Sequence, residues 1–298
     1  MSHSVMLTDS GLETDLIFHH GHDLPDFASF PLLDDAAGRD LLRQYFRDHI
    51  EVAERAGLGI VLETPTWRAS ADWGDRLGYA AEDLERINRD AVDLVAAARE
   101  GFRTTVLVSG CLGPRGDGYQ ADTSMTADEA EAYHAPQVRA LRAADLVSAL
   151  TISTAAEATG IVRAVVGAGL PVVISFTVEV DGRLPDSTTL AAAIREVDEG
   201  TDGAASWFMV NCAHPDHLAP ALSAGGAWLE RLHGVRANAS RRSHAELDVS
   251  TDLDDGDPIE LARGLLAIRR QFPSVRILGG CCGTDVRHVH EIANALVG

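Results

Sequence analysis

Eight short apolar runs recur along the chain, and each is followed by a longer stretch with a helical spacing of apolar residues. The short runs are rich in valine, isoleucine and leucine and contain few polar residues. This is typical of strands in a parallel sheet that is covered on both faces. The predicted strands are residues 5–9, 58–64, 104–110, 145–151, 170–178, 205–212, 232–238 and 275–281.

The stretches between these runs have the pattern of amphipathic helices. Residues 39–57 and 84–101 carry apolar side chains near i, i+3 and i+4, and both stretches end at a glycine, a common residue after a helix C-terminus. A third helix is predicted over 126–144, where Thr126 and Glu129 have the spacing of a capping box.

Eight strands that alternate with helices predict a single (β/α)8 TIM barrel over residues 1–298. A doubly wound sheet usually has fewer strands and a Gly-x-Gly-x-x-Gly turn after its first strand, whereas this chain has Asp-Ser-Gly-Leu-Glu-Thr there. No proline-, glycine- or serine-rich linker and no internal repeat divides the chain, so one domain is expected.

Composition narrows the possible functions. The 298 residues are 46% hydrophobic and carry a formal net charge of −20, which argues against nucleic acid and anionic membranes as partners. All 25 basic residues are arginine, which excludes Schiff-base aldolases, lysine-bound pyridoxal phosphate and a P-loop. The sequence shows no signal peptide and no run of 18 apolar residues, so a cytoplasmic location with reduced cysteines is expected. The oligomeric state stays open, a homo-oligomer included.

Polar residues gather at the ends of the predicted strands, where (β/α)8 barrels carry their active sites. All four cysteines belong to this group: Cys111 follows the third strand, Cys212 the sixth, and Cys281 and Cys282 the eighth. The other candidate site residues at strand ends are Asp9, Ser10, Gly11, Glu63, Thr64, Glu179, Asn211 and Asn238.

Three of the cysteines suit a Zn²⁺ site, since zinc prefers sulfur ligands and a catalytic zinc keeps one position open. Adjacent residues on a regular strand point to opposite faces, but the glycines around Cys281 and Cys282 allow the backbone to turn both thiols to one side. Two alternatives stay open at this point. The cysteines could be ordinary buried residues, or the adjacent pair could form a strained vicinal disulfide.

Three motifs carry a resemblance to a known family: Leu-Thr-Asp-Ser-Gly-Leu-Glu-Thr-Asp-Leu at 7–16, Val-Asn-Cys-Ala-His-Pro-Asp-His-Leu at 210–218, and Gly-Gly-Cys-Cys-Gly-Thr at 279–284. Over nearly its whole length the chain resembles the zinc-dependent homocysteine S-methyltransferases. The resemblance implies a (β/α)8 enzyme that transfers a methyl group from a cationic donor to a small thiol, with homocysteine as the default acceptor.

The resemblance also implies roles for individual residues. Cys212, Cys281 and Cys282 would bind the zinc ion, and Asn211 would shape the site beside them. Asp9 and the amides around Ser10 and Gly11 would face the amino-acid end of the thiol substrate. Asp9 is accordingly expected to serve the pocket and not the fold. Trp67 or Trp73 could hold the cationic donor through a cation–π contact.

One departure from the family pattern affects the substrate. Relatives specific for homocysteine typically carry a glutamate after the fourth strand that holds the substrate's amino group, whereas this chain has Leu150 there. Leucine cannot pair with an ammonium group, and an unpaired buried charge is costly. Either Glu13, Glu63 or Glu179 takes over this role, or the acceptor is a thiol other than homocysteine.

The histidines after the first predicted strand and the polar residues after the seventh have no clear place in this site. His19, His20 and His22 are expected in a loop that covers the substrate rather than in a second metal site. Arg241 and Arg242 are expected to lie on a solvated surface or in local ion pairs, with contact to an anionic substrate group as the alternative. His244 could handle protons or could be a structural or surface residue.

Cys111 is not expected to be a fourth zinc ligand, because it would close the metal site. A zinc hydrolase on the same barrel and a non-catalytic zinc- or thiol-binding protein remain the rival functions.

Overall fold

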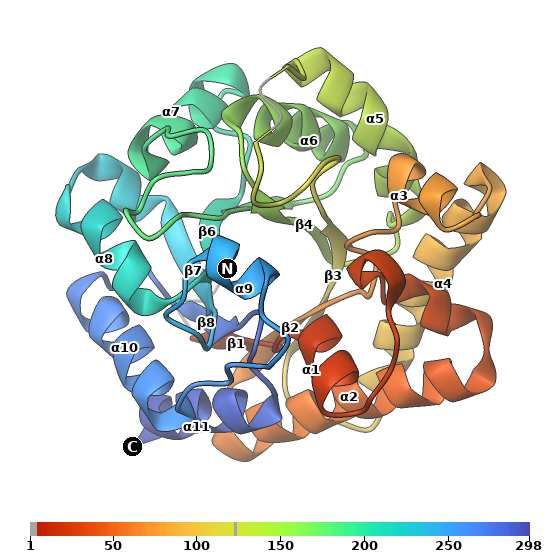
Figure 1. Ribbon diagram of the computed structural model, residues 1–298, viewed down its shortest axis with the longest axis horizontal. Coiled ribbons are helices and arrows are strands. Elements are labelled where there is room, and N and C mark those ends of the chain that lie inside the picture. Colours follow the sequence, from red (N-terminus) through yellow and green to blue (C-terminus); the bar gives the residue numbers. More distant parts are fainter. Residues whose placement is uncertain (1–4, 122–123) are drawn as a thin grey trace.

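The computed structural model describes residues 5–121 and 124–298, and it forms a closed barrel of eight parallel strands (Figure 1). The strands follow one another around the barrel in sequence order, and the predicted (β/α)8 fold is therefore confirmed. The strands are β1 (Met6–Thr8), β2 (Gly59–Glu63), β3 (Val106–Leu112), β4 (Leu146–Ile152), β5 (Val172–Phe176), β6 (Trp207–Ala213), β7 (Leu232–Ala237) and β8 (Ile277–Gly280).

All eight predicted strands are present, but some of their ends differ from the prediction. β3 continues to Leu112, so Cys111 lies inside this strand and not after it. β8 stops at Gly280, so Cys281 and Cys282 lie in the turn that follows the strand. The apolar runs located the strands well, whereas their last residues depend on hydrogen bonds between neighbouring strands.

Helices surround the barrel and cover the outer face of the strands (Figure 1). The principal helices are α1 (Leu12–Phe18), α2 (Ala36–Ala56), α3 (Ala71–Arg76), α4 (Ala81–Ala98), α5 (Ala127–Ala140), α6 (Ala155–Gly167), α7 (Leu190–Gly200), α8 (Pro215–Ser223), α9 (His244–Asp248), α10 (Pro258–Gln271) and α11 (Val286–Val297). Short 3-10 turns occupy Pro25–Phe27, Phe30–Asp34 and Ala227–Glu230.

Local sequence explains where α2 ends and where α5 begins. Gly57 caps α2 with a left-handed backbone (φ 67°), a conformation in which a side chain would be strained. α4 ends at Ala98, three residues before the predicted glycine. α5 begins at the predicted capping box, where the Thr126 hydroxyl accepts the Glu129 amide and the Glu129 carboxylate accepts the Thr126 amide.

The barrel interior is layered. Near the amino ends of the strands, an apolar cluster packs together in the interior, formed by Val61, Leu146, Val173, Trp207, Met209 and Ile277. Side chains on a strand alternate between the two faces, so residues two positions further along point the same way. These next inward positions are occupied by buried polar residues, namely Glu63, Ser148, Ser175 and Asn211. The barrel interior therefore has an apolar layer near the amino ends of the strands and a polar layer near their carboxyl ends.

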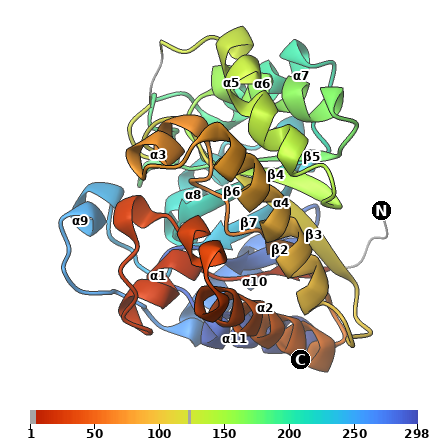
Figure 2. The ribbon, with the colours of Figure 1, turned by 90° about the vertical axis from the view of Figure 1, so that its right-hand side faces the viewer.

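Two short helices lie at that same carboxyl end. α1 directly follows β1, and α9 follows β7; Figure 2 shows both on the same side of the barrel. Among the described residues, none of the helices combines the length and apolar character that crossing a membrane requires.

Candidate metal and substrate site

Three cysteine thiols meet at the carboxyl end of the barrel. Cys212 is the sixth residue of β6, and Cys281 and Cys282 follow β8. The Sγ atom of Cys212 lies 2.7 Å from that of Cys281 and 3.8 Å from that of Cys282. The three Sγ atoms all lie within 4.8 Å of one another. The predicted convergence of strands six and eight is thus present in the structure.

This set of donors fits a zinc ion. With Zn–S bonds of ~2.3 Å in a tetrahedron, two ligand sulfurs are about 3.8 Å apart. The Cys212–Cys282 separation already has this value, and Cys281 Sγ would have to move about 1 Å away from Cys212. All three cysteines are free, so neither a vicinal nor any other disulfide occupies the thiols. Three thiolates leave the fourth tetrahedral position available to a sulfur substrate.

The turn after β8 directs both adjacent thiols to one place. The Cys281 amide donates to the Ala237 carbonyl at 2.8 Å, and the Cys282 carbonyl accepts the Ala239 amide at 3.1 Å. Both bonds tie the turn to the end of β7. Gly283 then adopts a left-handed backbone (φ 78°), which glycine tolerates without strain. The glycine-rich sequence therefore serves backbone geometry around the two thiols.

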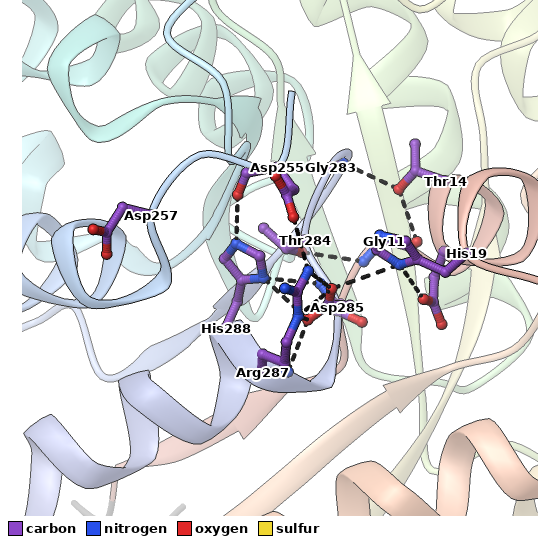
Figure 3. A network of polar contacts seen from close by, with 12 residues as sticks. Gly11, Thr14, His19, Asp255, Asp257, Gly283, Thr284, Asp285, Arg287 and His288 are labelled. Carbon is purple, nitrogen blue, oxygen red and sulfur yellow. Dashed lines mark hydrogen bonds and ion pairs between the residues drawn. The ribbon is translucent and has the colours of Figure 1, made fainter. Parts of the chain in front are cut away.

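Contacts with the first βα turn and with α11 fix this segment from the other side (Figure 3). The Gly283 amide donates to Thr14 Oγ1 at 3.0 Å, and the Gly11 amide donates to Thr284 Oγ1 at 3.2 Å. Asp285, the N-cap of α11, binds the Arg287 side chain. The cysteine turn is therefore held on both sides before any ligand enters.

Cys212 lies at a strained point of the backbone. Its φ is 55°, a left-handed value that is uncommon for a residue with a side chain. Thr151, at the end of β4, has a similar φ of 62°. The neighbouring Asn211 side chain binds Thr151 twice: Oδ1 accepts the Thr151 amide at 2.8 Å, and Nδ2 donates to Thr151 Oγ1 at 2.8 Å. The same Nδ2 lies 3.6 Å from Cys281 Sγ. Such strain commonly marks functional sites.

His244 and Asn238 hold the main chain of Cys212. The Cys212 carbonyl accepts from His244 Nε2 at 2.6 Å and from Asn238 Nδ2 at 3.1 Å. The other ring nitrogen of His244 lies 3.0 Å from Glu179 Oε1. The ring is therefore held in a fixed orientation between the Glu179 carboxylate and the Cys212 carbonyl. His244 also stacks on Tyr119 at 4.1 Å, and Tyr119 Oη lies 4.0 Å from Cys282 Sγ.

A second group of charged residues lies in the polar layer, and the sequence did not reveal its centre, Arg236. Asp9 Oδ1 lies 2.6 Å from Arg236 Nη1, and Asp9 Oδ2 accepts the Glu63 amide at 3.1 Å. Glu63 Oε1 lies 3.9 Å from the same guanidinium nitrogen. Side chains of all three residues are at most 7% exposed. The signal that could have revealed this group is the presence of Arg236 between Val235 and Ala237, near the carboxyl end of a strand.

Burial and charge act on these groups in opposite directions. Burial raises the pKa of Glu63 to about 7, even though the nearby charge of Arg236 opposes this. Burial alone would lower the pKa of Arg236, but the carboxylates of Asp9 and Glu63 outweigh it and raise that pKa above its usual value. Arg236 is therefore a permanent cation in the barrel, whereas Glu63 changes charge near neutral pH.

The thiols and the charged group open into one cavity of about 370 Å³. Most of the site residues expected from the sequence line it. These are Asp9, Ser10, Gly11, Glu13, Glu63, Thr64, Asn211, Cys212, Asn238, Cys281 and Cys282. Leu150, Tyr119, Arg236 and His244 also contribute to its wall. Glu179 is absent from the lining, because its carboxylate pairs with the far side of the His244 ring.

The amides of Ser10 and Gly11 do not match the role that the sequence suggested. The Ser10 amide donates to Tyr45 Oη at 3.2 Å, and the Gly11 amide donates to Thr284. Both N–H groups are therefore already bonded within the protein, and the expectation that they face a substrate carboxylate is corrected. Their partners lie far away in the sequence, so no local sequence pattern could predict these bonds.

Trp67 and Trp73, the two candidates for a cation–π contact with the donor, both contact the side chain of Arg68. The Arg68 guanidinium lies 4.0 Å from the Trp67 ring centroid and 3.5 Å from that of Trp73. Trp73 is not part of the cavity wall. Trp73 therefore has no contact with the cavity, whereas Trp67 lines the cavity and also contacts Arg68.

The arginines after β7 lie outside the cavity lining. Arg241 is bound by Asp216 at 2.9 Å and Glu260 at 2.8 Å, and Arg242 lies 3.7 Å from Asp254. Local ion pairs account for both arginines, and neither contacts the cavity as an anion-binding residue would.

The histidine-rich segment after α1 also has local partners. His19 Nδ1 lies 2.9 Å from Asp15 and 3.6 Å from Asp285, and His20 lies 3.8 Å from Asp15. His19, Asp15 and Asp285 are close enough to hold an ion, but Asp285 is already bound by Arg287 and His288 (Figure 3). We therefore assign this group to the support of the cysteine turn.

Comparison with known proteins agrees with this site. The family model for homocysteine S-methyltransferase matches residues 6–296, so the chain belongs to that enzyme family. Homocysteine S-methyltransferase YbgG from Bacillus subtilis is 24% identical over 280 residues, which cover 85% of this chain and 83% of YbgG.

Solved structures show the same fold. The metallated form of the homocysteine methyltransferase MmuM from Escherichia coli superimposes with a TM-score of 0.77 at 21% identity, over 98% of this chain and 96% of MmuM. Its oxidized form gives a TM-score of 0.78 at 20% identity over the same shares. These likenesses concern the fold, and the metal site of this chain is indicated by its own cluster of three thiols.

Proposed function

We propose that this protein is a zinc-dependent thiol S-methyltransferase whose default acceptor is homocysteine. The observation that carries the proposal is the cluster of Cys212, Cys281 and Cys282 at the wall of the cavity. Soft thiolate ligands suit Zn²⁺, and three of them leave one position for a sulfur substrate. A zinc ion bound there would lower the pKa of the acceptor thiol, which is otherwise ~8.5, so that the reactive thiolate predominates at neutral pH.

The reaction exchanges one carbon–sulfur bond for another. The acceptor thiol loses its proton to solvent, and its sulfur lone pair attacks the methyl carbon of a sulfonium donor. The donor C–S bond breaks, and its electron pair stays on the donor sulfur, which leaves as a neutral thioether. The attacking sulfur, the methyl carbon and the leaving sulfur must lie in line, so the protein's main task is to position two substrates.

The residues around the cavity suit these two substrates. Asn211, Asn238 and His244 hold Cys212 and its neighbours in place through the bonds described above. At the mouth the lining includes acidic residues, which favour the approach of a cationic donor; these are Asp117, Asp248, Asp252 and Asp254. The protein's net charge of −20 acts in the same direction.

Two rival functions remain for the test to separate. A zinc hydrolase would use the open metal position for water, but hydrolases usually hold zinc with histidine and carboxylate ligands. A non-catalytic protein would bind a thiol without transferring a methyl group. We also propose that residues 1–298 form one domain and that the protein acts in the cytoplasm, where three free thiols stay reduced.

The test is a methyl-transfer assay with zinc-loaded protein. A panel of small thiols would be combined with S-methylmethionine and with S-adenosylmethionine, and methylated products would be measured by mass spectrometry. Methylation of homocysteine that disappears in Cys281→Ser would support the proposal. Thiol binding without product for every donor would instead indicate a binding protein, and hydrolysis of a donor would indicate a hydrolase.

A further inference from the structure

Glu63 carries an unused hydrogen-bond acceptor at the wall of the cavity. The residue is 7% exposed, and its Oε2 atom is buried without a partner among the described residues. The hydroxyls of Ser109 and Ser148 lie near the Glu63 carboxylate and act to lower its pKa, and they lie 2.7 Å from each other. Even so, Oε2 itself has no hydrogen-bond partner among the described residues. Buried polar atoms are rarely left unpaired, so an empty acceptor that lines a cavity points to a ligand.

The other two candidate carboxylates are already occupied. Glu13 Oε1 accepts the Ser29 hydroxyl at 2.7 Å, and Glu179 lies 3.0 Å from His244 outside the cavity lining. Glu63 differs from both because one of its carboxylate oxygens, Oε2, is buried without a partner among the described residues. Arg236 is the nearby cation, and it lies 2.6 Å from Asp9 but 3.9 Å from Glu63.

Charge balance defines the missing group. Asp9, Glu63 and Arg236 together carry two carboxylates and one guanidinium, so an ionised Glu63 leaves one negative charge in a buried place. A cation would neutralise this charge, and a hydrogen-bond donor would satisfy Oε2. A sulfonium ion provides the charge but has no N–H group. An ammonium group provides both.

Position relative to the thiols agrees with an acceptor substrate. The main-chain carbonyl of Asp9 accepts the Gly280 amide at 3.2 Å, and Gly280 immediately precedes Cys281. The charged group is therefore joined directly to the cysteine turn. A short molecule with a thiol at one end can reach the cysteines with its sulfur while its other end enters the polar layer.

We propose that Glu63 pairs with the α-ammonium group of an amino-acid thiol and is the residue that determines acceptor specificity. Asp9 and Arg236 act as positioning residues that hold the Glu63 carboxylate in place. This inference rests on the proposed methyl transfer to a thiol, and it assigns the contact with the acceptor's ammonium group to one residue of this chain. It also explains how a cavity lined by Leu150 can accept an amino acid.

The experiment compares an acceptor that has the ammonium group with one that lacks it. The value of kcat/KM would be measured for homocysteine and for 4-mercaptobutyrate with the same donor, in wild type, Glu63→Gln and Glu13→Gln. Glutamine keeps the size of the side chain and removes its charge. We expect Glu63→Gln to lower the homocysteine value by about 100-fold and the mercaptobutyrate value by less than about threefold. Glu13→Gln is the matched control, and it should change both acceptors by the same factor.

A binding measurement keeps the test independent of turnover. Calorimetry with methionine and with 4-(methylthio)butyrate, both product-like thioethers, should show that Glu63→Gln weakens only methionine. Equal effects on both ligands, or no effect on either, would overturn the assignment of Glu63. Absence of methyl transfer in wild type, with selective binding of methionine still dependent on Glu63, would contradict the proposed function but retain this binding role.

Discussion

Asp9 and Arg236 form a buried ion pair, with Oδ1 2.6 Å from Nη1 and both side chains at most 5% exposed. The same aspartate accepts the Glu63 amide, and the same guanidinium donates to the Ser10 carbonyl at 3.2 Å. The pair thus joins the ends of β1, β2 and β7 while it lines the cavity. Asp9 therefore holds neighbouring strands together as well as lining the cavity, a contact within the fold that the sequence did not predict.

Replacement of Asp9 by asparagine should therefore destabilise the protein as well as impair activity. The change leaves the Arg236 charge buried without its partner, which typically costs about 3–5 kcal/mol. Urea unfolding would measure this loss. The matched control is Asp128→Asn, because Asp128 pairs with Arg163 but is 89% exposed. That substitution should change the free energy of unfolding by less than about 1 kcal/mol. Equal stability of Asp9→Asn and wild type would show that the buried pair is not a structural contact.

Glu63 should make stability depend on pH in a defined direction. Burial raises its folded-state pKa to about 7, above the unfolded value near 4.5. The folded state thus favours the protonated form, and this contribution is present below pH ~4.5 and is lost as the pH rises through about 7. Asp9 and Arg236 are the charged groups that face Glu63.

Glu63→Gln removes this titration. In the absence of ligand, wild type loses this contribution as the pH rises, whereas the variant does not. The free energy of unfolding of the variant, relative to wild type, should therefore increase from pH 5 to pH 8 by about 3 kcal/mol at most. Thermal unfolding at both pH values gives the comparison. A stability difference that stays constant with pH would mean that Glu63 is not held as a buried, uncompensated acid.

The apolar pattern of the sequence predicted the barrel and the meeting of Cys212 with Cys281 and Cys282. These predictions succeeded because strand order in a (β/α)8 barrel follows sequence order, so the ends of known strands must share one rim. Arg236 was missed because its inward direction depends on the register of β7. The bonds of the Ser10 and Gly11 amides were missed because their partners come from elements that only the folded barrel brings near.

His244 offers a test of how the metal ligands are positioned. Its ring holds the Cys212 carbonyl at 2.6 Å and stacks on Tyr119, so it supports the cysteine backbone without donating to a thiol. His244→Ala should lower metal affinity by about 10–100-fold, as is usual when a residue that orients a ligand is lost. Competition with a chromophoric chelator would measure the affinity. His290→Ala, on the exposed side of α11, is the control. A similar loss in both variants would indicate general destabilisation instead.

The zinc content of the protein decides whether Cys212, Cys281 and Cys282 form a metal site. Elemental analysis of the purified wild-type protein should find about one zinc ion per chain. Cys281→Ser should lose most of it, because a serine hydroxyl is a much poorer zinc ligand than a thiolate. Cys111→Ser should retain the metal, because Cys111 lines the cavity but is not part of the three-thiol cluster. Full zinc retention in Cys281→Ser would contradict the assignment of the metal to Cys212, Cys281 and Cys282.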